Sequence, residues 1–188
     1  MSILNDGIRT ERLIIRNPQP EDLDGWHRQF SDRANMYYLQ DICTDSLEET
    51  RERLNNAIEQ SRAYDRTRYF LTVELAETDE YIGGTGYTVE KETPAGKTVH
   101  AGYFYLPGYH GKGYATEALR AVIRFAFEEG GVYLFKTGLF AENKASERVM
   151  QKCGLIKDTG YKEQARLDGR WCDRLAYQLL KPEWLVIP

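Results

Sequence analysis

Apolar and polar residues change their spacing along the chain in a way that predicts strands and helices. Segments with every second residue apolar, or rich in aromatic and β-branched residues, are expected to be strands, whereas apolar residues three or four positions apart predict helices. The expected strands cover residues 8–16, 68–75, 81–90, 98–106 and 132–140, with a final hairpin of 155–167 and 171–180. The expected helices cover residues 21–30, 46–63, 116–129 and 143–152.

Residues that start helices and turns support these boundaries. Ser46 and Glu49 form a capping box, in which each side chain satisfies a backbone N–H of the first turn. Asp168-Gly169 favours a two-residue hairpin turn. The element order predicts one domain, residues 1–188, with a mixed α/β sheet and helices on both faces.

A glycine-rich segment joins the strand at 98–106 to the helix at 116–129. It contains Gly108, Gly111, Gly113 and Ala115. Such a junction turns several backbone N–H groups toward one point, where the helix dipole adds to them, and this predicts a phosphate site. The segment has neither the Walker order nor a Rossmann fingerprint. The glycines alone are equally consistent with a plain capped helix start.

Composition mainly excludes classes of protein. A net charge of −4 argues against a nucleic-acid binder. Cys43, Cys153 and Cys172 lack metal-ligand spacing, so no metal is expected and the thiols are predicted to be reduced. The N-terminus lacks the apolar core of a signal peptide, and no apolar stretch approaches the roughly 20 residues that span a bilayer. We therefore expect a cytoplasmic protein without a membrane partner.

The order of these motifs resembles that of the GNAT superfamily of N-acetyltransferases. His110, Gly113 and Ala115 stand at the positions of its [Q/R]-x-x-G-x-[G/A] signature, with His110 replacing Gln or Arg. Four stretches resemble the ribosomal-protein N-terminal acetyltransferase branch (RimJ/RimL-like). They are Thr10-Glu-Arg-Leu-Ile-Ile-Arg16, Gly111-Lys-Gly-Tyr-Ala-Thr-Glu-Ala118, Asn143 with Ser146, and Asp168-Gly-Arg-Trp-Cys-Asp173 followed by Tyr177.

The resemblance implies a GNAT fold with a mostly antiparallel sheet of about six to seven strands and a splayed central strand pair. It also implies acetyl-CoA as the acyl donor, with its pantetheine arm on the strand before the junction and its pyrophosphate on the junction. The expected cofactor-binding residues are Phe104, Tyr105, Leu106, His110, Gly111, Lys112, Gly113, Tyr114, Ala115, Asn143 and Ser146. Lys112, Lys144 and Arg148 are either phosphate contacts or surface charges.

Two residues are candidates for catalysis. His100 occupies the position at which many relatives carry a glutamate base, in the stretch His100-Ala-Gly-Tyr103. An imidazole, with an unperturbed pKa near 6.5, is suited to take a proton from an amine, although a strand histidine without a role is the alternative. Ser146 is implied as the acid for the leaving thiolate, and Asn143 as a pantetheine contact. Their alternatives are a first-turn serine and an N-cap.

The acceptor is expected between the first two helices and the C-terminal hairpin. Aromatic residues there are either core residues or substrate contacts: Trp26, Tyr37, Tyr38, Tyr64 and Trp171. Asp41, Asp168 and Asp173 could attract a cationic amine, or Asp173 could brace the hairpin. The reaction implied is acetyl transfer to a primary amine, first a protein or peptide N-terminus. A small amine such as a polyamine, amino acid or aminoglycoside, and a non-catalytic acyl-CoA-binding module, remain alternatives, and a homodimer is left open.

Overall fold

The computed structural model describes residue 4 and residues 7–186. Its strands are β1 (Ile8–Arg9), β2 (Leu13–Arg16), β3 (Arg68–Leu75), β4 (Tyr81–Thr93), β5 (Gly96–Tyr105), β6 (Val132–Phe140), β7 (Ile156–Lys157), β8 (Glu163–Leu167) and β9 (Arg170–Leu180). Its α-helices are α1 (Leu23–Phe30), α2 (Leu47–Arg62), α3 (Tyr114–Glu128), α4 (Lys144–Lys152) and α5 (Lys181–Trp184). Short 3-10 helices cover Pro20–Asp22, Tyr37–Ile42 and Pro107–Tyr109.

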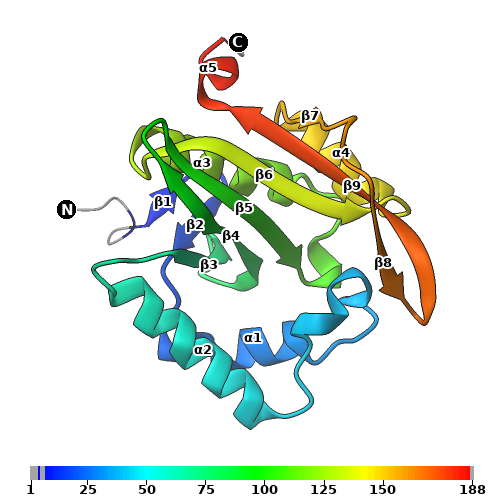
Figure 1. Cartoon of the computed structure of the whole chain (residues 1–188). Helices are drawn as coiled ribbons and strands as arrows, with labels where there is room; N and C mark the ends of the chain where they lie inside the picture. The colour runs from blue at the N-terminus through cyan, green and yellow to red at the C-terminus, as the bar shows by residue number, and fades with distance from the viewer. Residues whose placement is uncertain (1–3, 5–6, 187–188) are drawn as a thin grey trace.

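The strands form one sheet in the order β1-β2-β3-β4-β5-β6-β9-β7, with β8 paired to β9 (Figure 1). All neighbouring strands are antiparallel except β5 and β6, which α3 connects as a parallel crossover. The predicted mixed sheet with one parallel crossover is therefore confirmed. Within the described residues the sheet has nine strands, because the first expected strand is divided into β1 and β2 and the expected strand 155–167 is divided into β7 and β8.

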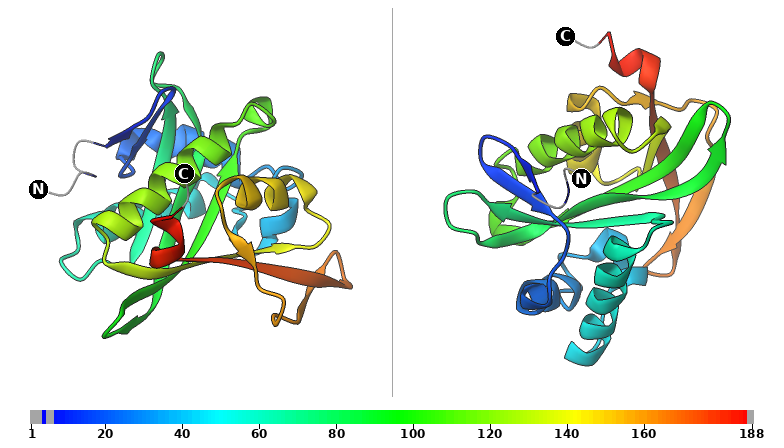
Figure 2. Two further views of the ribbon diagram at one scale, coloured as in Figure 1. Left: turned by 90° about the horizontal axis from the view of Figure 1, so that it is seen from above. Right: turned by 90° about the vertical axis from the view of Figure 1, so that its left-hand side faces the viewer.

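Helices cover both faces of the sheet, as Figure 2 shows from the side. The larger core lies under α3 and α4 and receives Val99, Ala101 and Tyr105 from β5. A smaller core lies under α1 and α2, where Phe104 packs against the ring of Phe30 with 4.9 Å between ring centroids. Successive side chains of β5 thus point to opposite faces, since strand side chains alternate.

The central strand pair separates partway along its length. β5 and β6 pair from Lys97 opposite Val132 to Ala101 opposite Thr137, and the pairing ends there. β6 stays paired with β9 as far as Phe140 opposite Arg174. The last residues of β5 consequently have no strand neighbour on the β6 side, and the two strands diverge in Figure 1. This is the splayed pair that the sequence resemblance implied.

Local sequence signals act at the predicted positions. The Ser46 hydroxyl accepts a hydrogen bond from the Glu49 backbone N–H at 3.1 Å and begins α2. The Glu49 carboxylate accepts from the Asp45 N–H at 2.7 Å, so only the Ser46 half of the predicted capping box is formed. Asp168 and Gly169 both have positive φ angles, 49° and 76°, between β8 and β9. Two consecutive positive φ angles are the requirement of a type I′ turn, which explains the Asp-Gly pair.

Candidate active site

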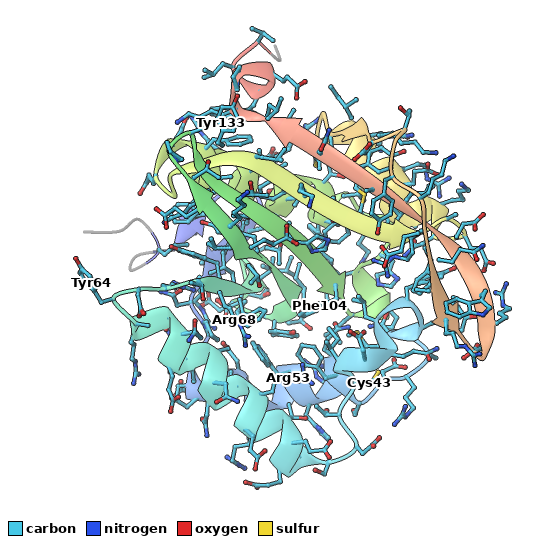
Figure 3. The ribbon with its side chains drawn as sticks, in the orientation of Figure 1. Cys43, Arg53, Tyr64, Arg68, Phe104 and Tyr133 are labelled. Carbon is cyan, nitrogen blue, oxygen red and sulfur yellow. The ribbon has the colours of Figure 1, made fainter. Side chains whose placement is uncertain are left out.

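A continuous groove of about 1580 Å³ passes through the opening between β5 and β6. One end lies at the glycine junction and the start of α4, and is lined by residues such as Gly111, Gly113 and Ser146. The other end lies between α1, α2 and the β8–β9 hairpin. Figure 3 labels Phe104 on its sheet side and Arg53 on its helix side. The groove therefore connects the predicted phosphate site with the predicted acceptor site.

The glycine junction has the backbone geometry of an anion site. Gly111 has a φ of 74°, and Gly113, the N-cap of α3, has a φ of 87°, a left-handed conformation that side chains disfavour. The first backbone hydrogen bond of α3 runs from the Glu117 N–H to the Gly113 carbonyl at 3.1 Å. The N–H groups of residues 114–116 precede it and have no acceptor inside the helix. Residues 114–116 line the groove, so the positive end of the helix dipole lies at the groove.

The N-terminal motif holds this junction in place. The Thr10 hydroxyl donates to Glu117 Oε1 at 2.7 Å, and the Arg12 side chain donates to Glu117 Oε2 at 2.7 Å. The Arg12 guanidinium also donates to the Lys112 carbonyl at 3.0 Å and stacks over the Tyr114 ring at 4.6 Å. Two motifs that the sequence presents about a hundred residues apart thus form one clamp around the start of α3.

Glu117 is the centre of that clamp, and its pKa reflects this. Burial acts to raise the pKa of the Glu117 carboxyl, but hydrogen bonds from Thr10 and Arg12 outweigh burial and lower it. A carboxyl with a lowered pKa stabilises the fold above its unfolded pKa, near 4.3, and loses this contribution as the pH falls through its folded pKa. The clamp is therefore intact at neutral pH.

We expect Glu117→Gln to raise the KM for acetyl-CoA severalfold with little change in kcat, since the junction loses its anchor while the reacting groups stay in place. The free energy of unfolding should fall by about 1–2 kcal/mol, as for other hydrogen-bonded charges that are not fully buried. Steady-state kinetics and thermal unfolding measure both. Glu128→Gln is the matched control, because Glu128 lies on the same helix in an exposed pair with Arg124 at 3.3 Å. Equal effects of the two substitutions would contradict the clamp.

The open edge of β5 presents alternate peptide groups. The Leu106 N–H donates to the Ile82 carbonyl at 2.9 Å, so the peptide groups of Leu106 and Phe104 face β4. Those of Tyr103 and Tyr105 face the groove. Of the three residues expected to pair with a pantetheine arm, Tyr105 is the one whose peptide group faces the groove, and the pairing itself stays a prediction. Phe104 instead contributes its ring to the acceptor end of the groove.

The Tyr105 carbonyl already has two donors. Nε2 of His110 lies 2.8 Å from it and Nδ2 of Asn35 donates to it at 3.0 Å. His110, which replaces the Gln or Arg of the signature, thus ties the glycine junction to the end of β5. Asn35 was not singled out from the sequence, because its contact with β5 spans 70 residues.

Asn143 and Ser146 lie together at the start of α4. The Asn143 side chain accepts from the Ser146 N–H at 3.1 Å, so Asn143 is the N-cap, and its amide group also lines the groove. The Ser146 hydroxyl lies 2.6 Å from the Tyr103 hydroxyl, which also donates to the Ser146 carbonyl at 3.1 Å. Burial raises the pKa of Tyr103 well above its usual range, more than the hydrogen bond with Ser146 lowers it. Tyr103 therefore keeps its proton.

Tyr103 is a site residue that the sequence analysis missed. Its position on β5, two residues before Tyr105, places it on the α3 and α4 face by strand alternation. That alternation was readable in the sequence. Its contact with Ser146, 43 residues away, was not.

His100 lies on the opposite face of β5, toward the acceptor end. Its Nε2 atom is 3.6 Å from the place that a Cβ atom on Gly138 would occupy, and Nη2 of Arg174 is 3.2 Å from the same place. The two side chains therefore lie close to each other beside Gly138. Desolvation lowers the pKa of His100, the charges of Lys136 and Arg174 lower it further, and Glu90 acts against them. The imidazole is consequently neutral at pH 7.

The other predicted acceptor residues separate into two groups. Trp26, Tyr37, Tyr38 and Asp41 line the groove. Tyr64 and Trp171 do not line it and are exposed. Asp168 accepts from Gln40 at 3.0 Å and Asp173 accepts from Gln164 at 2.7 Å, so Asp173 braces the hairpin as its alternative interpretation held.

The three cations considered for phosphate binding also differ. Lys144 pairs with Glu147 at 2.8 Å, and Nζ of Lys112 lies 5.3 Å from the centre of the Tyr109 ring. Arg148 is exposed, lines the groove and has no ion-pair partner among the described residues.

No group of His, Cys, Asp or Glu in residue 4 and residues 7–186 is arranged to hold a metal ion. In the same part of the chain, no helix has the length and apolar character that crossing a membrane requires.

Comparison with known proteins identifies relatives of this fold and site. The acetyltransferase (GNAT) domain family matches residues 12–156. The chain is similar to the probable N-acetyltransferase YjcK of Bacillus subtilis, with 29% identity over 161 residues that cover 86% of each chain. It is 28% identical to the ribosomal protein uS5-alanine N-acetyltransferase of Escherichia coli over 85 residues, which cover 45% of this chain and 44% of that one. The solved structure of spermidine N-acetyltransferase from Vibrio cholerae, in complex with CoA and spermine, has a TM-score of 0.79 at 20% identity and covers 94% of this chain and 99% of its own.

Proposed function

Because the chain belongs to the GNAT family of acetyltransferases, we propose that it transfers the acetyl group of acetyl-CoA to the N-terminal amine of a protein or peptide. The observation that carries this proposal is the groove, which continues past the opening of β5 and β6 and is open between α1, α2 and the β8–β9 hairpin. The motif Thr10-Glu-Arg-Leu-Ile-Ile-Arg16 and the partial match to the uS5-alanine enzyme support an N-terminal amine.

The donor would lie along the half of the groove that holds the glycine junction. The N–H groups of residues 114–116 and the junction from His110 to Gly113 would bind the pyrophosphate, with Arg148 nearby. The peptide group of Tyr105 would pair with the pantetheine arm, and the Asn143 amide would donate to it from the other side. The thioester would then lie in the opening between β5 and β6.

The chemistry requires two protons to leave the acceptor ammonium, one before and one after the attack, and one proton to reach the sulfur. His100 takes a proton from the acceptor ammonium, and the neutral amine attacks the thioester carbonyl carbon. The carbon–sulfur bond breaks, and the thiolate receives a proton from the hydroxyl pair of Tyr103 and Ser146. The nitrogen loses its second proton to solvent to give the amide, and solvent returns a proton to the hydroxyl pair. His100 and this pair lie on opposite faces of β5, so base and acid approach the opening from opposite sides.

The test is to incubate the full chain with acetyl-CoA and a panel of peptides and small amines, and to measure thiol release and the acetylated product by mass spectrometry. Turnover with peptides supports the proposal. Turnover with small amines alone would mean that the acceptor is a small amine, which is the second candidate. Small amines are included because the spermidine enzyme has a similar fold. Binding of acetyl-CoA without thiol release from any amine would indicate a non-catalytic acyl-CoA-binding module.

A further inference from the structure

The acceptor end of the groove contains arginine side chains that have no carboxylate partners. Arg53 on α2, Arg68 on β3 and Arg174 on β9 all line it, and Figure 3 shows Arg53 and Arg68 near Phe104. None of these three makes an ion pair or a side-chain hydrogen bond within the described ranges, residue 4 and residues 7–186. Other arginines do: Arg170, for example, pairs with Glu142 at 2.7 Å. The acceptor end of the groove therefore presents three guanidinium groups that can receive an anionic ligand.

Arg174 is the most constrained of the three. Its guanidinium stacks over the Phe140 ring at 4.8 Å and is half-buried. Its Nε atom is buried and has no hydrogen-bond partner. A buried donor left without an acceptor is unfavourable, and a carboxylate matches the fork of a guanidinium with two parallel hydrogen bonds. The site thus has the chemistry of a receptor for a small anion.

The position of Arg174 relates this anion to the reacting amine. Nη2 of Arg174 and Nε2 of His100 lie 3.2 Å and 3.6 Å from the same point beside Gly138. A molecule that placed its carboxylate on Arg174 would therefore place a nearby amine within reach of His100. An amino acid carries an amine and a carboxylate close together in this way. A peptide N-terminus followed by an acidic side chain does so too.

The protein's own carboxylates in the groove are poorly placed to bind Arg174 in place of a ligand. Asp41, Asp45, Glu49 and Glu52 line the groove, but all four are exposed and belong to the segment 41–52 on the helix side. Asp45 pairs with Arg33, and Glu49 accepts from the Asp45 N–H at 2.7 Å. The sheet side of the groove thus presents the guanidinium of Arg174, whereas these carboxylates lie on the helix side.

We propose that the acetyl acceptor is an amine that carries a carboxylate, and that Arg174 binds this carboxylate next to the amine that His100 deprotonates. This inference rests on the proposed acetyl transfer and specifies its substrate class. Arg53 on the helix side and Arg68 on the sheet side line the same end of the groove and bind additional acidic groups of longer acceptors. A polyamine, which has no anionic group, is a poor acceptor.

The test compares acceptors in matched pairs that differ only in the anionic group. One arm uses free amino acids against their amides, another uses peptides with Glu or Gln as the second residue, and spermidine is the polycation. The wild-type enzyme is expected to prefer the carboxylate member of at least one arm by about tenfold to a hundredfold in kcat/KM, the range of hydrogen bonds to charged groups. The arm that shows the preference identifies whether the carboxylate is the main-chain or a side-chain group.

Arg174→Gln should remove most of this preference, and Arg174→Lys should retain part of it. Arg166→Gln is the matched control, because Arg166 is another arginine that lines the groove. It differs from Arg174 in its place, since it lies over the Trp171 ring at 5.3 Å. Titration with acetyl-CoA checks that each variant is folded. A wild-type enzyme without the preference, or an Arg174→Gln variant that keeps it, would overturn the inference while leaving acetyl transfer intact. If no amine releases thiol with any variant, the proposed function fails and the acceptor class fails with it.

Discussion

Replacing His100 with glutamine is expected to reduce kcat by about a hundredfold or more, while the KM for acetyl-CoA stays near the wild-type value. General-base catalysis contributes on the order of 10²–10⁴ to enzymatic rates, and glutamine keeps a polar side chain of similar size without a basic nitrogen. The KM should not change, since His100 faces the acceptor side of β5 and the glycine junction lies beyond the opening. Steady-state kinetics with saturating acceptor measure the effect.

The pH dependence of kcat/KM provides an independent check on His100. A base must be unprotonated, and desolvation together with Lys136 and Arg174 lowers the pKa of this imidazole below its ordinary value near 6.5. At pH 7 and above His100 is already unprotonated, so its titration should not change kcat/KM there. kcat/KM should fall only when the pH drops below 6.5. The residual activity of His100→Gln should lack this acidic limb. A variant that retained wild-type kcat at every pH would exclude His100 as the base.

The second large effect is expected when both hydroxyls of the Tyr103 and Ser146 pair are removed. The two oxygens are 2.6 Å apart, so either can donate a proton to the thiolate when the other is absent. Tyr103→Phe and Ser146→Ala should each reduce kcat by about tenfold or less, and the double variant by about a hundredfold or more, as for the loss of a general acid. Single-turnover kinetics should place the loss in the chemical step.

Tyr177→Phe is the control for that experiment. The Tyr177 hydroxyl on β9 donates at 2.9 Å to Glu147, which lies on α4 as Ser146 does. Removing this hydroxyl changes packing near α4 without touching the opening between β5 and β6. A double variant with wild-type kcat would show that the pair does not supply the proton. A single Ser146→Ala variant as slow as the double would assign the role to Ser146 alone.

Local signals in the sequence predicted the elements and the junction well, because caps and glycines act within a few residues. Gly113 is required where φ is positive, and the bounds of β6 follow the apolar pattern of residues 132–140. Contacts between distant segments could not be predicted in this way. The clamp of Thr10 and Arg12 on Glu117 joins motifs about a hundred residues apart, and each motif alone looks like an ordinary strand end or helix start.

Charge in the acceptor site shows the same limit. Counting acidic residues on the expected segments favoured a cationic acceptor, but a count does not reveal which charges already have partners. Asp168 and Asp173 are occupied by Gln40 and Gln164. Among the described residues the buried Nε atom of Arg174 has no hydrogen-bond partner, and Gly138, which has no side chain, lies beside the guanidinium.

The divergence of β5 from β6 also creates an edge strand in the middle of a sheet. Edges of this kind can recruit a strand from another molecule, and proteins protect them. Here the Tyr105 carbonyl is covered by His110 and Asn35, two side chains that a bound substrate arm could displace. Amide hydrogen exchange at Tyr103 and Tyr105 should consequently slow when the donor binds, while exchange at Leu106, whose N–H is held by Ile82, should change little. The interior edge would then report occupancy of the groove without any chemistry taking place.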